Sequence, residues 1–211
     1  DEYVGRVMTA LEQAQLTDRR LEIFSSDNGT THTGRLDTNF YVGGTDPPFF
    51  NSTADLRGNK GSLYEGGIRV PMIARLPGVI PNGAVNDTPS YFADWFPTLC
   101  DAVGFDKPNG LDGDSLWPTL IGRQESLGPR RPMIWAFTEY GGQAAVRIGN
   151  FKVIRQGLKT PHPGDWEVYD LSVDRSERND LAASRGDLIA QARQILDQEV
   201  ANNEVFPLHI P

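Results

Sequence analysis

Hydrophobic positions along this chain recur at helical spacing in some segments and gather in short runs in others. The first apolar residues return every three to four positions, which predicts an amphipathic helix over residues 3–15. The same spacing predicts a final helix over residues 185–201, with one apolar face formed by Leu188, Ile189, Ala192, Ile195 and Leu196. A third helix is predicted over residues 91–103, where Pro97 must kink the helix or begin a new first turn.

Shorter apolar runs predict strands. The run at residues 21–25 predicts a buried strand, and residues 70–76 predict a second one. Closely spaced runs with glycine- or proline-containing turns between them follow at residues 133–138, 144–149, 151–155 and 166–170. Strands joined by short turns favour an antiparallel sheet. The chain is therefore predicted to be α/β, with a separate antiparallel sheet near its end.

Composition narrows the classes of partner. The chain has 211 residues, 38% hydrophobic residues and a net charge of −8, enough for one sizeable core or a core plus a small subdomain. No basic run is present, which argues against a nucleic-acid partner. No apolar run is long enough to cross a bilayer, so no membrane span is expected. Asp1-Glu2 does not suit the start of a signal peptide, and the sequence begins like the middle of a larger protein.

Cys100 is the only cysteine, so no intrachain disulfide can form. It lies in an apolar, helix-like segment, which favours a buried small hydrophobe over a nucleophile.

The residues after the first predicted strand are candidates for metal binding. Asp27 and Asn28 follow it directly and offer one anionic and one neutral oxygen donor. Open α/β sheets place ligands beyond the carboxyl ends of their strands, and Ca²⁺ and Mg²⁺ prefer such oxygens. The alternative is an ordinary turn, because Asp-Asn-Gly is also a common turn sequence.

Lys60 and His32 are the candidates for substrate contact. Lys60 lies between Gly58 and Gly61, where its ammonium can approach an anion closely, although a surface lysine is the plain alternative. His32 has the chemistry to donate to an anion or to protonate a leaving group; the alternative is a solvated loop histidine. Both lie at the borders of a long loop over residues 29–60, and a loop of this length is usually functional.

Several stretches resemble the second half of a type I, arylsulfatase-like sulfatase. The main ones are Ser-Asp-Asn-Gly at residues 26–29 and Leu-Arg-Gly-Asn-Lys-Gly-Ser-Leu-Tyr-Glu-Gly-Gly-Ile-Arg-Val-Pro at residues 56–71. The second motif is specific, whereas Asp-Asn-Gly by itself is not. The resemblance covers nearly the whole chain, since it extends to residues 1–16, 92–99, 146–154, 167–171 and 179–181. It implies the second half of an alkaline-phosphatase-like α/β/α sandwich over residues 1–128 and a C-terminal subdomain over residues 129–211.

The resemblance also implies roles for single residues. Asp27 and Asn28 would coordinate the active-site Ca²⁺, with Mg²⁺ possible, and Lys60 would bind the sulfate group. His32 is carried over as a catalytic and substrate-binding residue, although its spacing departs from the commoner family pattern. Glu65 and Arg69 are expected to be structural partners that fix the turn.

One family feature is absent from this sequence. The nucleophile of these enzymes is a formylglycine in a Cys-x-Pro-Ser-Arg or Ser-x-Pro-Ser-Arg motif, and neither motif occurs here. The formylglycine is therefore expected in a missing N-terminal half, and the isolated chain is expected to be inactive.

The resemblance implies a sulfate-ester small molecule or a sulfated glycan as substrate, and a periplasmic, extracellular or lysosomal location. Two alternatives stay open: a phosphonate or phosphodiester hydrolase of the same superfamily, and a non-catalytic binding chain.

Overall fold

The computed structural model describes residues 1–31, 50–123, 125, 128–201 and 203–210. The chain divides into two compact units, which are described separately. Unit 1 comprises Asp1–Ser25 and Pro71–Arg131, and unit 2 comprises Ser26–Val70 and Pro132–Pro211. The domain division predicted between residues 128 and 129 concerns the longer α/β domain and stays a prediction.

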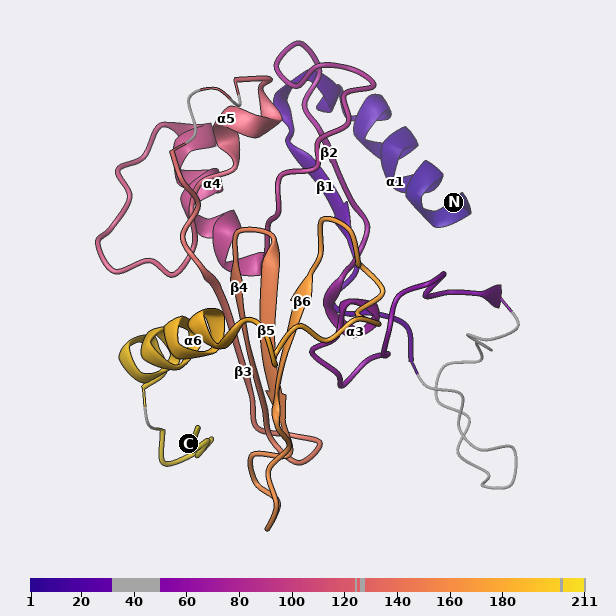
Figure 1. Cartoon of the computed structure of the whole chain (residues 1–211). Coiled ribbons are helices and arrows are strands. Elements are labelled where there is room, and N and C mark those ends of the chain that lie inside the picture. Colours follow the sequence, from indigo (N-terminus) through magenta and orange to yellow (C-terminus); the bar gives the residue numbers. More distant parts are fainter. Residues whose placement is uncertain (32–49, 124, 126–127, 202, 211) are drawn as a thin grey trace. The chain divides into compact units, whose positions relative to one another are not determined.

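Unit 1 begins with helix α1 (Glu2–Gln13) and a 3₁₀ turn at Thr17–Arg19, and then forms strand β1 (Glu22–Ser25). Strand β1 pairs antiparallel with β2 (Met72–Arg75), as Figure 1 shows. Both strands lie where the apolar runs predict them, but the prediction that the first is buried is wrong. Phe24 is 50% exposed and Ile73, its partner across the ladder, is 63% exposed. The reason is that α1 buries none of its own residues, and β2 is the only strand paired with β1 in the described ranges.

The rest of unit 1 is helical. A 3₁₀ turn at Phe92–Asp94 leads into α4 (Trp95–Val103), and α5 (Trp117–Leu120) follows in the segment expected to be a link. Pro97 lies in the first turn of α4, so the second of the two predicted outcomes is confirmed. Cys100 is only half-buried, which corrects the expectation of a buried thiol, because α4 buries Pro97 and Thr98 instead.

Unit 2 contains the predicted antiparallel sheet, with strand order β3-β4-β5-β6. Helix α3 (Glu65–Ile68) precedes it and helix α6 (Gly186–Glu199) follows it. The strands are β3 (Met133–Phe137), β4 (Gln143–Ile148), β5 (Phe151–Gln156) and β6 (Trp166–Asp170). Each pairs with the next along the chain, and Figure 1 shows them side by side. The prediction of short strands with tight turns is confirmed.

The two faces of this sheet are covered by different parts of unit 2. Alternate residues of a strand point to opposite faces. One face packs against the apolar side of α6, where Leu188, Ala192 and Leu196 are buried, as the helical spacing predicts. The other face packs against Leu63 and Tyr64, which belong to the segment that carries Lys60. The core of unit 2 therefore places the Lys60 segment directly on a sheet.

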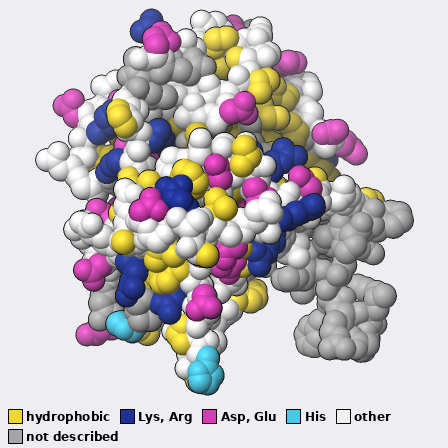
Figure 2. All heavy atoms as spheres, viewed as in Figure 1, with side chains coloured by type: hydrophobic (Ala, Val, Ile, Leu, Met, Phe, Trp, Pro, Cys, Tyr) yellow, Lys and Arg dark blue, Asp and Glu magenta, His cyan; other side chains and the backbone are white. Residues whose placement is uncertain are grey.

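The surface is mixed in character. On the face drawn in Figure 2, Lys and Arg side chains alternate with Asp and Glu. None of the described helices has the length and apolar composition needed to cross a membrane.

Candidate functional site

Two turns of unit 2 lie against each other and together form the candidate site. The first contains Asp27 and Asn28, and the second contains Lys60. The Lys60 backbone N–H donates to the carbonyl of Thr30 at 2.8 Å, and the Gly29 N–H donates to the carbonyl of Gly67 at 2.9 Å. Both bonds join residues that are far apart in the sequence, and they bring the predicted metal-binding turn to the predicted sulfate-binding turn.

Glycines make this approach possible. A Cβ at Gly29 would lie 1.9 Å from the Gly66 carbonyl oxygen, and one at Gly67 would lie 2.1 Å from the Ser62 carbonyl oxygen. A side chain at Gly29 would push the two turns apart, and one at Gly67 would disrupt the fold of the Lys60 segment itself. Around Lys60 the backbone itself requires glycine, because Gly58 and Gly61 have φ angles of +81° and +91°. The glycine-flanked turn predicted from sequence is confirmed.

The side chains at the apices are accessible. Asp27 and Lys60 are exposed and Asn28 is half-buried. Within the described ranges neither Asp27 nor Lys60 forms an ion pair, so both charges remain available to a ligand. His32 lies outside the described residues. The ligand roles of Asp27, Asn28, Lys60 and His32 stay predictions.

The described residues do not contain a complete metal site. No group of three or more His, Cys, Asp or Glu side chains among them is placed to hold an ion. Asp27 and Asn28 nevertheless suit a hard cation, because they are adjacent oxygen donors and the Asp27 carboxylate is exposed. They fit as part of a larger ligand set.

Strand β4 holds the Lys60 turn through Gln143. Its amide nitrogen Nε2 donates to the carbonyl of Gly61 at 2.8 Å, and its Oε1 accepts from the Leu63 N–H at 3.1 Å. Gln143 is buried, so both of its amide functions are used within the protein. The turn is therefore fixed to the sheet on the C-terminal side of Lys60.

Strand β5 holds the same segment through Lys152, whose side chain is fully buried. The ammonium Nζ donates to the Leu63 carbonyl at 2.9 Å and to Glu65 Oε1 at 2.9 Å, and it lies 2.6 Å from Glu177 Oε1. Glu177 Oε2 accepts from the Glu65 N–H at 2.7 Å. Burial raises the pKa of Glu177, although the charge of Lys152 acts in the opposite direction. We call Lys152, Glu65 and Glu177 the buried triad.

Glu65 and Arg69 are partners, as predicted: Arg69 Nη1 lies 3.3 Å from Glu65 Oε2.

Arg57, just before the Lys60 turn, belongs to a second polar cluster. Its guanidinium lies 3.8 Å from the centre of the Tyr64 ring and donates to the Tyr169 hydroxyl at 2.7 Å. It also pairs with Glu167 at 3.3 Å, and the Tyr64 hydroxyl donates to the same carboxylate at 2.8 Å. Burial raises the pKa of both Tyr64 and Tyr169, so these phenols stay protonated donors. The cluster fixes the start of the turn to strand β6.

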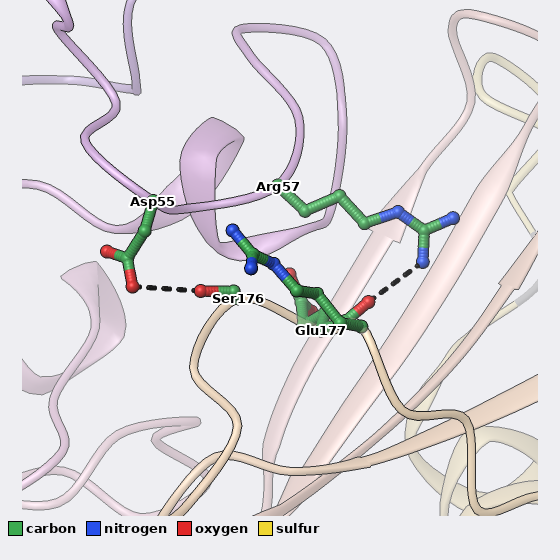
Figure 3. Close-up of a pocket in the computed structure, with 5 residues that line it drawn as sticks. Asp55, Arg57, Ser176 and Glu177 are labelled. Atoms are coloured by element: carbon green, nitrogen blue, oxygen red, sulfur yellow. Dashed lines mark hydrogen bonds between the residues drawn. The ribbon is translucent and has the colours of Figure 1, made fainter.

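A polar hollow of about 530 Å³ lies beside this cluster, lined by Asp55, Arg57, Ser176, Glu177 and Arg178 (Figure 3). Ser176 Oγ donates to Asp55 Oδ2 at 2.9 Å, and Arg175 pairs with Asp55 Oδ1 at 3.0 Å. The Arg175 hydrogen bond lowers the pKa of Asp55. Asp55 thereby holds the loop after β6.

Sequence reasoning missed the residues that support the turn, namely Gln143, Lys152, Glu167 and Glu177. A weak signal exists for Lys152, which shares the period-two face of β5 with the buried Ile154. A lysine beside a buried isoleucine on one strand face indicates a buried partner, and the polar Gln156 on the same face keeps this signal weak. Nothing local to Glu177 marks it, because its partners Lys152 and Glu65 lie far away in the sequence.

Two family models match the chain. The model described as "N-sulphoglucosamine sulphohydrolase, C-terminal" matches residues 58–203, and the model described as "Sulfatase" matches residues 1–105. Together they span both turns of the candidate site and both units.

Known proteins give the same result. The chain is 36% identical to arylsulfatase A from Homo sapiens over 220 residues, covering 94% of this chain and 40% of that protein. Its structure is similar to that of Ps i-CgsB in complex with k-i-k-neocarrahexaose, with a TM-score of 0.74, 26% identity and coverage of 98% of this chain and 42% of that one. It also matches BT4656 in complex with its substrate D-glucosamine-2-N,6-O-disulfate, with a TM-score of 0.69, 24% identity and coverage of 93% and 37%. The chain thus spans less than half of each of these proteins.

Proposed function

This chain belongs to the sulfatase family of the alkaline-phosphatase-like superfamily, and on that premise we propose that it is the C-terminal part of an enzyme that hydrolyses sulfate esters. The observation that carries the proposal is the backbone contact between the Asp27–Asn28 turn and the Lys60 turn. This contact brings two oxygen donors and one ammonium group into the same part of unit 2. A cation and a lysine near each other suit a substrate group that bears negative charge.

Asp27 and Asn28 would hold a Ca²⁺ ion, with Mg²⁺ as the alternative. Ca²⁺ takes six to eight oxygen ligands, so these two residues supply only part of the set and the rest would come from the N-terminal part of the enzyme. The cation would stabilise negative charge on the sulfate, and a formylglycine in the N-terminal part would supply the nucleophile. The exposed Asp27 carboxylate, without an ion pair in the described ranges, supports the assignment.

Lys60 would bind an oxygen of the sulfate group. Gly61 directly after Lys60 and Gly58 two residues before it carry no side chains that could hinder the approach of the ammonium to the substrate. The backbone bonds and Gln143 hold the turn before substrate arrives, so little reorganisation accompanies binding. His32 would provide a further substrate contact.

The substrate class is a sulfate-ester small molecule or a sulfated glycan. A disulfated glucosamine is the substrate bound to BT4656, whose fold this chain shares. We also propose a periplasmic, extracellular or lysosomal location for the enzyme.

The test is steady-state hydrolysis of an aryl sulfate by the full-length enzyme and its Lys60→Ala and Lys60→Arg variants. Loss of a preorganised electrostatic donor costs roughly a hundredfold in rate. We expect kcat of Lys60→Ala to fall by about that factor and KM to rise, with only partial rescue by Lys60→Arg, because a planar guanidinium does not replace a compact ammonium.

An aryl phosphodiester serves as the second substrate, since preferential phosphodiester hydrolysis would favour the phosphohydrolase alternative. A folded Lys60→Ala enzyme with wild-type kcat and KM would show that Lys60 is a surface lysine without a role in substrate binding or catalysis.

A further inference from the structure

We propose that Lys152 is a positioning residue for Lys60, acting through the buried triad, and this inference rests on the proposed function. Lys152 lies in β5, on the sheet face that the Lys60 segment covers. Its ammonium joins three separate segments: its own strand, residues 63–65 and the loop after β6 that carries Glu177. The first acceptor, the Leu63 carbonyl, lies three residues after Lys60.

Lys152, directly and through Glu177, binds backbone groups of residues 63–65. Nζ binds the Leu63 carbonyl, and Glu177, held by the same ammonium, accepts the Glu65 backbone N–H. Gln143 adds bonds to the Gly61 carbonyl and the Leu63 N–H. Four backbone groups between Gly61 and Glu65 are therefore bound by three buried side chains of the sheet and the following loop. Glycine makes this turn flexible, so its single conformation must come from such contacts.

The burial of charge in the triad also supports a positioning role for Lys152. One ammonium sits between two carboxylates, and all three side chains are nearly inaccessible, with Lys152 0%, Glu177 1% and Glu65 4% exposed. Buried ion clusters are a poor source of stability, since apolar replacements of similar shape are often as stable or more so. In some proteins, buried polar or ionic groups select one arrangement among several. Here the selected arrangement is that of the turn whose apex is Lys60.

The test is a double-mutant cycle in the full-length enzyme between Lys152→Met and Lys60→Ala, with aryl sulfate kinetics and thermal melting. If Lys152 acts through Lys60, Lys152→Met lowers kcat/KM roughly tenfold or more when Lys60 is intact, with most of the loss in kcat. In the Lys60→Ala background the same substitution changes kcat/KM by less than about twofold. Equal losses in both backgrounds would show that Lys152 only stabilises the fold and would overturn the proposal.

Two further variants keep the test decisive. Gln143→Met removes uncharged contacts to the same turn and replaces Lys152→Met if that variant does not fold; we expect the same dependence on Lys60. Arg155→Met is the matched control, because Arg155 lies in the same strand but donates to Gly164 and stacks on Trp166, away from the turn. Its effect should be the same whether Lys60 is intact or replaced by alanine.

The cycle also separates two kinds of failure. If Lys60→Ala alone leaves kcat/KM unchanged, the proposed function of Lys60 fails. If Lys60→Ala is severe but the coupling to Lys152 is absent, only the positioning role fails.

Discussion

The two units differ in how far they bury their hydrophobic side chains. In the described part of the chain, the buried hydrophobic side chains belong to unit 2, apart from Leu116 and the ring of Pro97 in unit 1. Unit 1 instead exposes large apolar side chains on nearly every element, as at Val7 of α1, Phe24 of β1 and Ile73 of β2. In Figure 2, hydrophobic side chains come to the surface in the upper right of the view, where Figure 1 draws α1.

The difference in burial shows that only unit 2 has a hydrophobic core of its own among the described residues. Unit 2 surrounds its sheet with its own α6 and its own Lys60 segment, so it carries a complete core. Unit 1 is held together by polar contacts of the buried Asp94. This carboxylate pairs with Arg130 and accepts hydrogen bonds from the backbone N–H groups of Tyr91 and Asp114. Among the described residues, neither of the two clusters of buried hydrophobic residues lies in unit 1. An extended apolar surface on a folded protein marks an interface. If the chain is the C-terminal part of a longer enzyme, as proposed above, the exposed apolar side chains of unit 1 are the surface that the N-terminal part would cover.

The largest expected effect comes from separating the chain from that N-terminal part. We expect the isolated chain to show no turnover of an aryl sulfate at any Ca²⁺ concentration, because the nucleophile and further metal ligands are expected elsewhere. The measurement is a discontinuous sulfate-release assay over a Ca²⁺ titration, with the full-length enzyme as positive control. Turnover by the isolated chain that Lys60→Ala abolishes would contradict the expectation.

A pair of isoleucine substitutions compares the two cores directly. Ile154→Ala removes a fully buried side chain from unit 2, and such truncations cost about 2–5 kcal/mol of unfolding free energy. Ile73→Ala removes a side chain that is 63% exposed in unit 1, and we expect it to change the stability of the isolated chain by less than about 0.5 kcal/mol. Urea unfolding of both variants measures the difference.

The same pair sharpens the comparison in the full-length enzyme. There Ile73→Ala should become substantially destabilising, because the N-terminal part would bury this position. An unchanged small effect would show that the apolar face of β2 stays uncovered.

The smallest expected effect is on the pH dependence of stability, to which Asp114 of unit 1 and Glu177 of unit 2 contribute with opposite sign. In unit 1, burial raises the pKa of Asp114, but hydrogen bonds and charge from Arg131 outweigh it and leave the pKa below 3.8. A lowered pKa contributes stability above the unfolded value, and this is lost as pH falls through the folded value. The stability difference between wild type and Asp114→Asn should therefore be present at neutral pH and should shrink as pH falls below about 3.9.

Glu177 of unit 2 behaves in the opposite way. Burial raises the pKa of Glu177 above 4.5, so its contribution to the free energy of unfolding is largest below that pH and falls as pH rises through the folded pKa.

The control for Asp114→Asn is Asp106→Asn, which removes an exposed carboxylate without an arginine partner in the described ranges. The measurement is the urea midpoint across the acid range. A difference for Asp114→Asn that is independent of pH would contradict the assignment.

Much of the local structure was predictable. Short apolar runs separated by turn residues located the four strands of unit 2, and helical spacing identified the buried face of α6, because these patterns depend only on neighbouring residues. Asp27, Asn28 and Lys60 were predicted as site residues from their residue types, the flanking glycines and the resemblance to sulfatases, and their roles stay predictions. The expectation of a buried first strand failed because burial depends on what covers a strand, and the described part of the chain leaves Phe24 of β1 50% exposed and Ile73 of β2 63% exposed.

The sequence by itself determined which short segments become strands or helices and which turns require glycine, since local sterics and periodicity decide both. Only the tertiary structure decided that the Asp27 and Lys60 turns touch, and that Lys152 is buried between Glu65 and Glu177. Lys152 and Glu65 are 87 positions apart, and a charge is buried or solvated according to partners that distant. The physical reason is that desolvation of an ion is tolerated only where the fold supplies opposite charge and hydrogen bonds in one place.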